Sequence, residues 1–159
     1  MLLAFGDSHH NRPALKKIAK ILQDQKPEVF VHTGDNFSDF VWLKKITGIP
    51  GFGVRGNCDL GIIPGAKDEI VFDYRDKKIW LVHGHQYGVK YSTQELWARA
   101  KQLAVQVVVF GHTHSPMVEQ QDDIWLVNPG SIPLPRGGSP GYARLTVEND
   151  VKLQLVQVK

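Results

Sequence analysis

The sequence predicts an α/β domain built from two β-sheets that pack face to face, with helices on the outside. In the first part of the chain, short apolar runs ending near glycine alternate with segments of helical periodicity, which is typical of β-α-β units and a mainly parallel sheet. From Met117 onward the pattern is that of strands alone, so a second and more antiparallel sheet is expected. The 159 residues suffice for one core, and we expect residues 1–159 to form a single domain.

The first half of the chain is expected to contain three strands and two helices. Met1–Phe5 is a short apolar run stopped by glycine, as in a buried strand. Asn11 can cap the helix that follows, Pro13 suits its first turn, and apolar residues then repeat at helical spacing. The other expected elements are a strand at Glu28–His32, a helix at Ser38–Ile46 and a strand at Gly53–Arg55.

The second half of the chain no longer alternates strand-like and helical segments and consists mainly of strand-like ones. Ile70–Tyr74 and Lys78–His83 are expected to form a hairpin, and Thr93–Leu103 a helix. Further strands are expected at Val107–Phe110, Met117–Gln120, Ile124–Val127, Tyr142–Val147 and Val151–Val158. Because ligands bind beyond the carboxyl ends of strands in α/β sheets, we expect function at that end of the first set of strands.

Composition and charge exclude several classes of protein. The net charge of +3 is small and no basic stripe is evident, so a nucleic-acid partner is not expected. Cys58 has no second cysteine to pair with, which favours a reducing compartment. The amino-terminal residues do not resemble a leader, and no apolar stretch approaches the roughly 18 residues of a membrane span. We therefore expect a cytoplasmic globular protein with no membrane contact.

Five short segments follow strand-like runs and carry ligands for hard metal ions. They are Gly6-Asp7-Ser8-His9, Gly34-Asp35-Asn36, Gly56-Asn57-Cys58-Asp59, Val82-His83-Gly84-His85 and Gly111-His112-Thr113-His114. Each segment alone has an ordinary explanation, such as a surface turn or a helix cap. Two divalent ions about 3.5–4 Å apart, however, need several fixed nitrogen and oxygen ligands. The five segments together predict a two-metal hydrolytic site.

These segments resemble those of the calcineurin-like metallophosphoesterases, specifically the small bacterial and archaeal phosphodiesterases. The resemblance extends from Gly6 to Ser131 and implies a four-layer αββα sandwich of two mixed β-sheets flanked by helices. It implies two divalent ions, commonly manganese, although iron, zinc, nickel or cobalt suit the same ligands. One ion would be held by Asp7, His9, Asp35 and His114. The other would be held by Asp35, Asn57, His83 and His112, so that Asp35 bridges the two. His85 would have a structural or supporting role.

The predicted reaction is hydrolysis of a small phosphate ester, most simply a phosphodiester. Two divalent ions bring more positive charge than Asp7 and Asp35 neutralise, so the site would attract a phosphate and stabilise its transition state. A hydroxide bridging the ions would attack phosphorus in line. Asp35, Asn57 and His112 are the expected catalytic residues of this centre. Positive side chains available for the non-reacting phosphate oxygens are Arg12, Arg55 and Arg136, of which Arg136 is preferred and Arg12 is expected to be a surface charge.

Cys58 departs from the wider superfamily, where a histidine that can protonate the leaving group often follows the metal-binding asparagine. A thiol, with an ordinary pKa of about 8.5, is a poor general acid at neutral pH. Asp59, which would orient such a histidine, is present. We expect modest activity that favours acidic leaving groups such as nitrophenols. The alternative is that Cys58 is a small thiol without a chemical role.

Two other functions compete with an esterase. A protein-interaction scaffold that resembles the retromer subunit of the same fold would have lost metal ligands, whereas here all seven positions carry the expected residue types. A nuclease would be expected to show a basic stripe and the leaving-group histidine. The sequence leaves open the physiological substrate, the preference for diesters over monoesters, and whether the chain forms a homo-oligomer.

Overall fold

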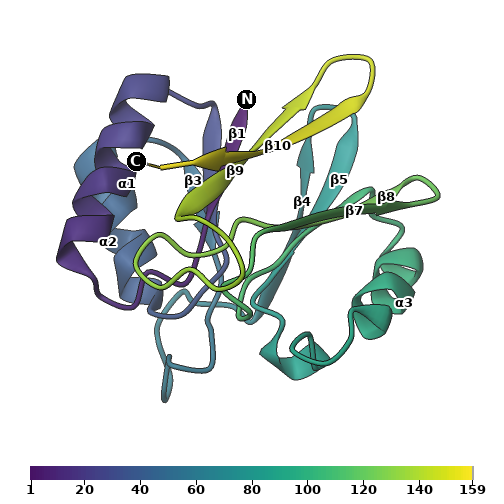
Figure 1. Ribbon diagram of the computed structural model, residues 1–159, viewed down its shortest axis with the longest axis horizontal. Helices are drawn as coiled ribbons and strands as arrows, with labels where there is room; N and C mark the ends of the chain where they lie inside the picture. Colours follow the sequence, from purple (N-terminus) through teal and green to yellow (C-terminus); the bar gives the residue numbers. More distant parts are fainter. Residues whose placement is uncertain (159) are drawn as a thin grey trace.

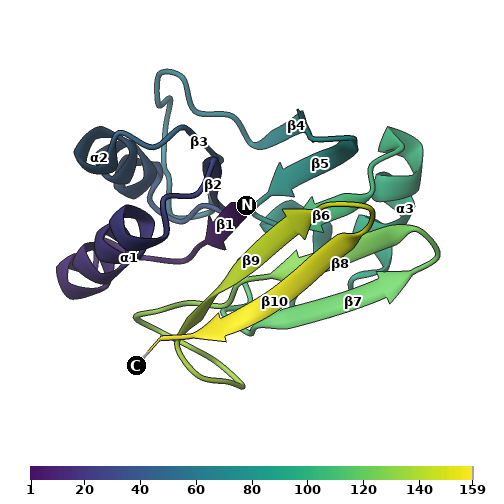
Figure 2. The same cartoon turned by 90° about the horizontal axis from the view of Figure 1, so that it is seen from above.

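Two five-stranded sheets pack face to face between helices, as Figure 1 shows for this computed structural model. The structure describes residues 1–158. Helices α1 (Arg12–Gln25) and α2 (Phe37–Thr47) cover the outer face of the first sheet. Helix α3 (Gln94–Leu103) covers the outer face of the second sheet, which the view from above also shows (Figure 2). The expected four-layer αββα sandwich is confirmed.

Both sheets mix parallel and antiparallel neighbours. The first has the order β10-β9-β1-β2-β3, with bounds Val151–Gln157, Gly141–Val147, Leu2–Phe5, Val29–His32 and Gly51–Gly53. The second has the order β4-β5-β6-β8-β7, with bounds Glu69–Tyr74, Lys77–Val82, Val107–Val109, Ile124–Asn128 and Met117–Gln121. A short 3-10 helix, η1 (His85–Tyr87), follows β5.

The expectation that one sheet would be more parallel than the other is wrong. Strands β1, β2 and β3 run parallel, but the carboxyl-terminal hairpin β9–β10 pairs antiparallel with the free edge of β1. The second sheet likewise has a parallel centre, β5-β6-β8, flanked by antiparallel β4 and β7. Pairing with β9 satisfies backbone groups that an exposed β1 edge would leave open.

The central strands show why the sandwich has three apolar interfaces. Along β1, Leu2 and Ala4 pack between the two sheets, whereas Leu3 and Phe5 pack against α1 and α2. This alternation follows from the two-residue period of a strand. A separate cluster that includes Trp80 and Leu96 packs between the second sheet and α3. Strand β1 is therefore apolar along its whole length because both of its faces are buried.

Two local predictions have different outcomes. The cap of α1 is confirmed, since the Asn11 side chain accepts a hydrogen bond from the Ala14 amide at 2.9 Å. The third strand was expected at Gly53–Arg55 but lies at Gly51–Gly53. A Cβ atom on Gly51 would lie 2.7 Å from Phe30, and one on Gly53 would lie 2.4 Å from Phe40. Glycine is required in β3 because these aromatic rings press against its backbone.

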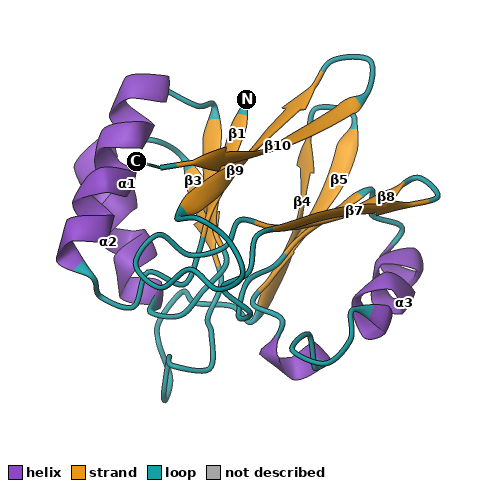
Figure 3. Cartoon of the chain, viewed as in Figure 1, coloured by secondary structure: helices purple, strands orange, loops and turns teal. Residues whose placement is uncertain are grey.

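Loops that follow the strands collect at one end of the sandwich, shown in teal at the lower end of Figure 3. Strands β1, β2, β5 and β6 run toward this end, and each is followed by one of the ligand-bearing segments. No helix within residues 1–158 has the length and apolarity needed to cross a membrane.

Candidate metal centre

The seven predicted ligand residues, which come from loops far apart in the sequence, meet at the loop end of the sandwich. The first group comprises Asp7, His9, Asp35 and His114, and the second comprises Asp35, His83 and His112. Within each group, one nitrogen or oxygen atom of every member lies within 4.8 Å of the others. The carboxamide of Asn57 joins the second group, since its Oδ1 atom is 3.1 Å from His83 Nε2. Asp35 belongs to both groups.

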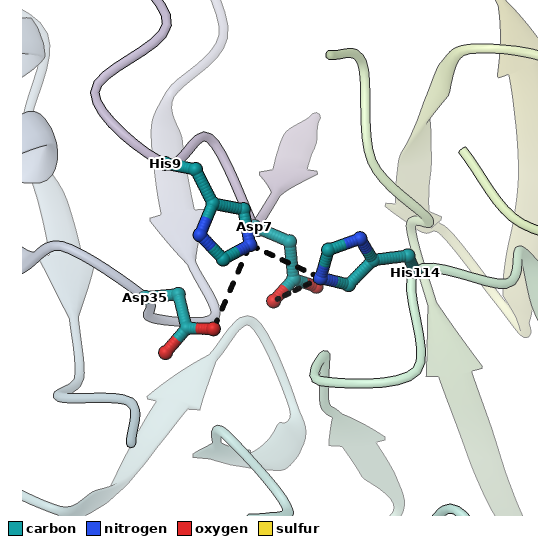
Figure 4. A group of neighbouring side chains, drawn as sticks. All are labelled: Asp7, His9, Asp35 and His114. Carbon is teal, nitrogen blue, oxygen red and sulfur yellow. Dashed lines mark hydrogen bonds and ion pairs between the residues drawn. The ribbon is translucent and has the colours of Figure 1, made fainter. Parts of the chain in front are cut away.

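The first group is compact (Figure 4). The His9 and His114 Nε2 atoms are 3.1 Å apart. His9 Nε2 is 3.7 Å from Asp35 Oδ2, and His114 Nε2 is 3.7 Å from Asp7 Oδ1. Two imidazoles and two carboxylates therefore direct nitrogen and oxygen atoms toward one point.

The second group is centred on His83. Its Nε2 atom is 3.2 Å from His112 Nδ1 and 3.3 Å from Asp35 Oδ1, in addition to the contact with Asn57. The other oxygen of Asp35 faces the first group. The two groups are therefore adjacent and share one carboxylate, as a bridged pair of ions requires.

Backbone carbonyls fix the orientation of two of the imidazoles. His83 Nδ1 is 2.8 Å from the carbonyl of Thr33, and His114 Nδ1 is 2.9 Å from that of Leu134. A carbonyl only accepts hydrogen bonds, so each Nδ1 carries the proton. In the neutral ring, the Nε2 lone pair then points into the group, which is the arrangement of metal-binding histidines.

Burial keeps these imidazoles neutral. Desolvation lowers the pKa of His83 and of His112 from 6.5 to about 4, and burial also lowers the pKa of His114. At neutral pH these three rings are therefore neutral, and the Nε2 lone pairs of His83 and His114 face into the groups. Such acceptors repel one another unless a cation lies between them, and nitrogen and oxygen donors in this combination suit first-row divalent metals. The donor set fits the predicted ions.

The two carboxylates differ in their electrostatics. Burial, followed by the nearby charge of Asp35, raises the pKa of Asp7 well above its ordinary value. Burial also acts to raise the pKa of Asp35, but His83 and the backbone N–H of Cys58 outweigh it, and the net shift is downward. Asp35 is thus the carboxylate that stays ionised most readily, which suits a residue shared by both groups.

Backbone conformation distinguishes this site from an ordinary cluster of turns. Five of the seven candidate ligands have positive φ angles: Asp7 at 50°, His9 at 48°, Asp35 at 52°, His112 at 67° and His114 at 61°. Left-handed conformations are uncommon for residues other than glycine and occur preferentially at functional sites. The loops are held in shapes that direct these side chains inward.

Two glycines before the ligands are required by close packing. A Cβ atom on Gly56 would lie 2.1 Å from Asp35 Oδ1, and one on Gly6 would lie 1.9 Å from Thr33 Oγ1. A side chain at Gly56 would therefore displace the shared carboxylate. These contacts explain why glycine begins the segments that contain Asp7 and Asn57.

Cys58 and Asp59 occupy different surroundings. Cys58 is exposed, its backbone N–H donates to Asp35 Oδ1 at 3.1 Å, and burial followed by Asp35 raises the pKa of its thiol. Asp59 accepts hydrogen bonds from the backbone N–H groups of Asn36 at 3.1 Å, Phe37 at 2.7 Å and Gly56 at 2.9 Å. It thereby caps the amino terminus of α2 from another loop.

The remaining predicted residues lie around the groups. Arg55 is paired with Asp68 at 2.6 Å, whereas the backbone N–H of Arg136 donates to the His114 carbonyl at 3.0 Å, which places its loop beside the first group. The ring of His85 is 5.3 Å from that of His83 and lies outside both groups. Arg12 lines a hollow between α1 and α2.

Lys90 was not identified from the sequence. Its positive charge acts on both Asp7 and His112, so it lies near both groups. It stands in a loop without a recognisable motif, and a single exposed lysine carries no signal in the sequence.

Comparisons with known proteins agree with this geometry. The model of the calcineurin-like phosphoesterase superfamily domain matches residues 1–150. The chain is 34% identical over 150 residues to the probable metallophosphoesterase YsnB of Bacillus subtilis, covering 94% of this chain and 85% of that protein. It is 35% identical over 107 residues to the phosphodiesterase YfcE of Escherichia coli, covering 62% of this chain and 52% of that protein.

Solved structures show the same fold. A conserved protein from Streptococcus pneumoniae superposes with a TM-score of 0.81 at 24% identity, covering 98% of this chain and 88% of that one. Zinc-bound Vps29 from Entamoeba histolytica superposes with a TM-score of 0.76 at 22% identity, covering 98% and 97%. The family match over residues 1–150, together with the 34% identity to YsnB, establishes that the chain belongs to the calcineurin-like phosphoesterase superfamily.

Proposed function

We propose that this protein is a cytoplasmic, single-domain phosphodiesterase that depends on two divalent metal ions and acts on a small phosphate ester. One observation carries the proposal: two groups of imidazole and carboxylate side chains converge on one shared carboxylate, Asp35. Such an arrangement is unfavourable without cations and suits a pair of them.

The residues divide between two ion sites as the family resemblance implies. Asp7, His9, Asp35 and His114 would hold one ion, and Asp35, Asn57, His83 and His112 the other. Manganese is the proposed metal, and iron, zinc, nickel and cobalt suit the same donors. Bound there, the ions would supply Lewis acidity toward the phosphoryl oxygens and a nucleophile drawn from water at neutral pH.

The chain itself supplies orientation and charge. Thr33 and Leu134 hold the rings of His83 and His114 so that their lone pairs face the ions. Lys90 and Arg136 add positive charge near the two groups, which favours an anionic substrate. These interactions form before substrate binds, and preorganised charge of this kind stabilises a phosphoryl transition state.

Cys58 limits the choice of leaving group. Its raised thiol pKa keeps it protonated at neutral pH, yet a thiol is a weaker acid than an imidazolium and transfers its proton less readily. We therefore propose that the enzyme favours esters whose leaving groups depart without protonation, such as nitrophenolates. Two relatives, YfcE and MJ0936, are named phosphodiesterases, which supports a diester substrate for this protein.

The alternative is a protein-interaction scaffold of the same fold. The shared fold with Vps29 is the observation that favours a scaffold, and one of the Vps29 structures contains zinc. Metal binding alone therefore does not separate the two proposals, and the deciding measurement is turnover.

The test is hydrolysis of bis(p-nitrophenyl) phosphate by chelator-stripped protein before and after manganese is added back. We expect activity only with the metal, and its loss in Asp35→Asn. Asp24→Asn is the matched control, because Asp24 is an exposed acid on α1 that pairs with Lys20. If folded protein shows no turnover with any divalent metal, the scaffold becomes the better account.

A further inference from the structure

Two pairs of consecutive residues next to the candidate ion sites share an unusual backbone conformation. His9 and His10 have φ angles of 48° and 55°, and Asp35 and Asn36 have φ angles of 52° and 77°. The first member of each pair is a candidate ligand. Left-handed conformations are uncommon for residues other than glycine, and specific contacts hold each pair in place.

Asp39 holds the first pair. It lies in the first turn of α2, with only 4% of its surface exposed, yet it contacts the loop after β1. Its Oδ2 atom accepts from the backbone N–H of His10 at 2.9 Å and from the Ser8 hydroxyl at 2.7 Å, and its Oδ1 atom is 2.9 Å from His10 Nδ1. The residues on both sides of His9 are thus tied to one buried carboxylate.

Asp59 holds the second pair. Its carboxylate accepts from the backbone N–H groups of Asn36 and Phe37, where α2 begins, and from that of Gly56. Gly56 directly precedes Asn57, a candidate ligand of the second site. Asp59 therefore joins the Asn57 loop to the residue that follows the shared ligand Asp35.

Both sets of contacts converge on the first turn of α2. Asp39 connects this turn to the loop of the first ion site, and Asp59 connects its beginning to the loop of the second. Because this turn is hydrogen-bonded to both loops, a loop that becomes ordered also restricts the conformations of the other loop. An ion that orders one loop would lower the conformational entropy cost of ordering the other, which produces positive cooperativity.

We propose that Asp39 and Asp59 are positioning residues that make the first turn of α2 a common support for both ion sites, so that the two ions bind cooperatively. This inference rests on the proposed two-metal function. It goes beyond the shared ligand. Asp35 would hold both ions directly, whereas Asp39 contacts neither candidate ligand group through its own carboxylate and acts only through Ser8 and His10.

The experiment titrates chelator-stripped protein with manganese by calorimetry and follows paired ions by electron paramagnetic resonance. Wild type should bind two ions cooperatively and show the signal of a coupled pair from the first additions. In Asp39→Asn and in Asp59→Asn, we expect affinity to fall about 10- to 100-fold, the range for residues that orient metal ligands. Isolated-ion signals should then precede the pair signal. Asp24→Asn, an exposed acid on α1, should behave as wild type.

The outcomes separate this inference from the function on which it rests. Wild type that binds no manganese would reject the proposed centre itself. Two results would overturn the proposed role of Asp39 and Asp59 without rejecting the two-metal centre. The first is independent binding of the two ions by wild type. The second is binding by Asp39→Asn that is as cooperative as in wild type. Circular dichroism of the metal-free variants checks folding. If Asp39→Asn does not fold, Ser8→Ala removes one of the three contacts and should show a smaller loss of affinity and cooperativity.

Discussion

Acidification is expected to destabilise the metal-free protein between pH 6.5 and pH 4, because buried histidines stay neutral in the folded state. Burial lowers the pKa of His32 and of His83 from 6.5 to about 4. The unfolded chain binds a proton at each histidine as the pH falls below about 6.5, whereas the folded chain does not until about pH 4. The contribution of these two histidines to the free energy of unfolding is therefore fully present above pH 6.5, and it is lost as the pH falls toward 4.

The expected loss of unfolding free energy on acidification is large for a protein of this size. Each of the two pKa shifts corresponds to about 3 kcal/mol of unfolding free energy, against a typical total of about 5–15 kcal/mol. Asp7 acts in the opposite direction, since its raised pKa lets the folded state take up a proton first. His32 is the better residue to vary because it lies outside both ligand groups, where its Nε2 atom is 3.0 Å from the Ser8 hydroxyl.

The assay is urea denaturation of chelator-treated protein at pH 7.5 and pH 4.5, followed by the fluorescence of tryptophan, of which Trp80 is fully buried. We expect wild type to lose several kcal/mol and His32→Asn to lose about 2–3 kcal/mol less between the two pH values. Manganese should stabilise the protein at pH 7.5 and much less at pH 4.5, because protons compete for the imidazoles. Equal stability at both pH values, or an unchanged loss in His32→Asn, would refute the reasoning.

Three further predictions concern the proposed centre. Asp35→Ala or His112→Ala should abolish hydrolysis of bis(p-nitrophenyl) phosphate while circular dichroism shows a folded protein; unchanged turnover in either would reject the ligand assignment. Cys58→His should increase kcat for diesters with poor leaving groups more than for nitrophenyl esters, because an imidazolium is the better general acid; equal effects on both would remove residue 58 from the acid position. Gly56→Ala should weaken manganese binding at least 10-fold, because its Cβ atom would lie 2.1 Å from Asp35 Oδ1; an unchanged calorimetric titration would contradict this contact.

Local sequence patterns were enough to predict most elements and the five ligand-bearing segments, and the family resemblance then implied which seven side chains would bind metal. The cap and apolar spacing of α1, the hairpin β4–β5 and the order of five ligand-bearing segments are properties of short stretches of chain. The segments could be interpreted together because loops after parallel strands must meet at one end of a sheet. The convergence of the two groups on Asp35 agrees with that expectation.

Contacts between distant segments decided the rest. The sequence did not determine that β9 pairs with β1, that Arg55 is neutralised by Asp68, or that Asp59 caps α2. A strand pattern specifies which side chains face the core but not which edge the strand joins, and a carboxylate in a loop shows nothing of the N–H group that it will meet. The residue types that can bind metal are thus readable from the sequence. The strained backbone that aims them, and the two carboxylates that hold it, exist only in the packed structure, because they depend on groups brought together from across the chain.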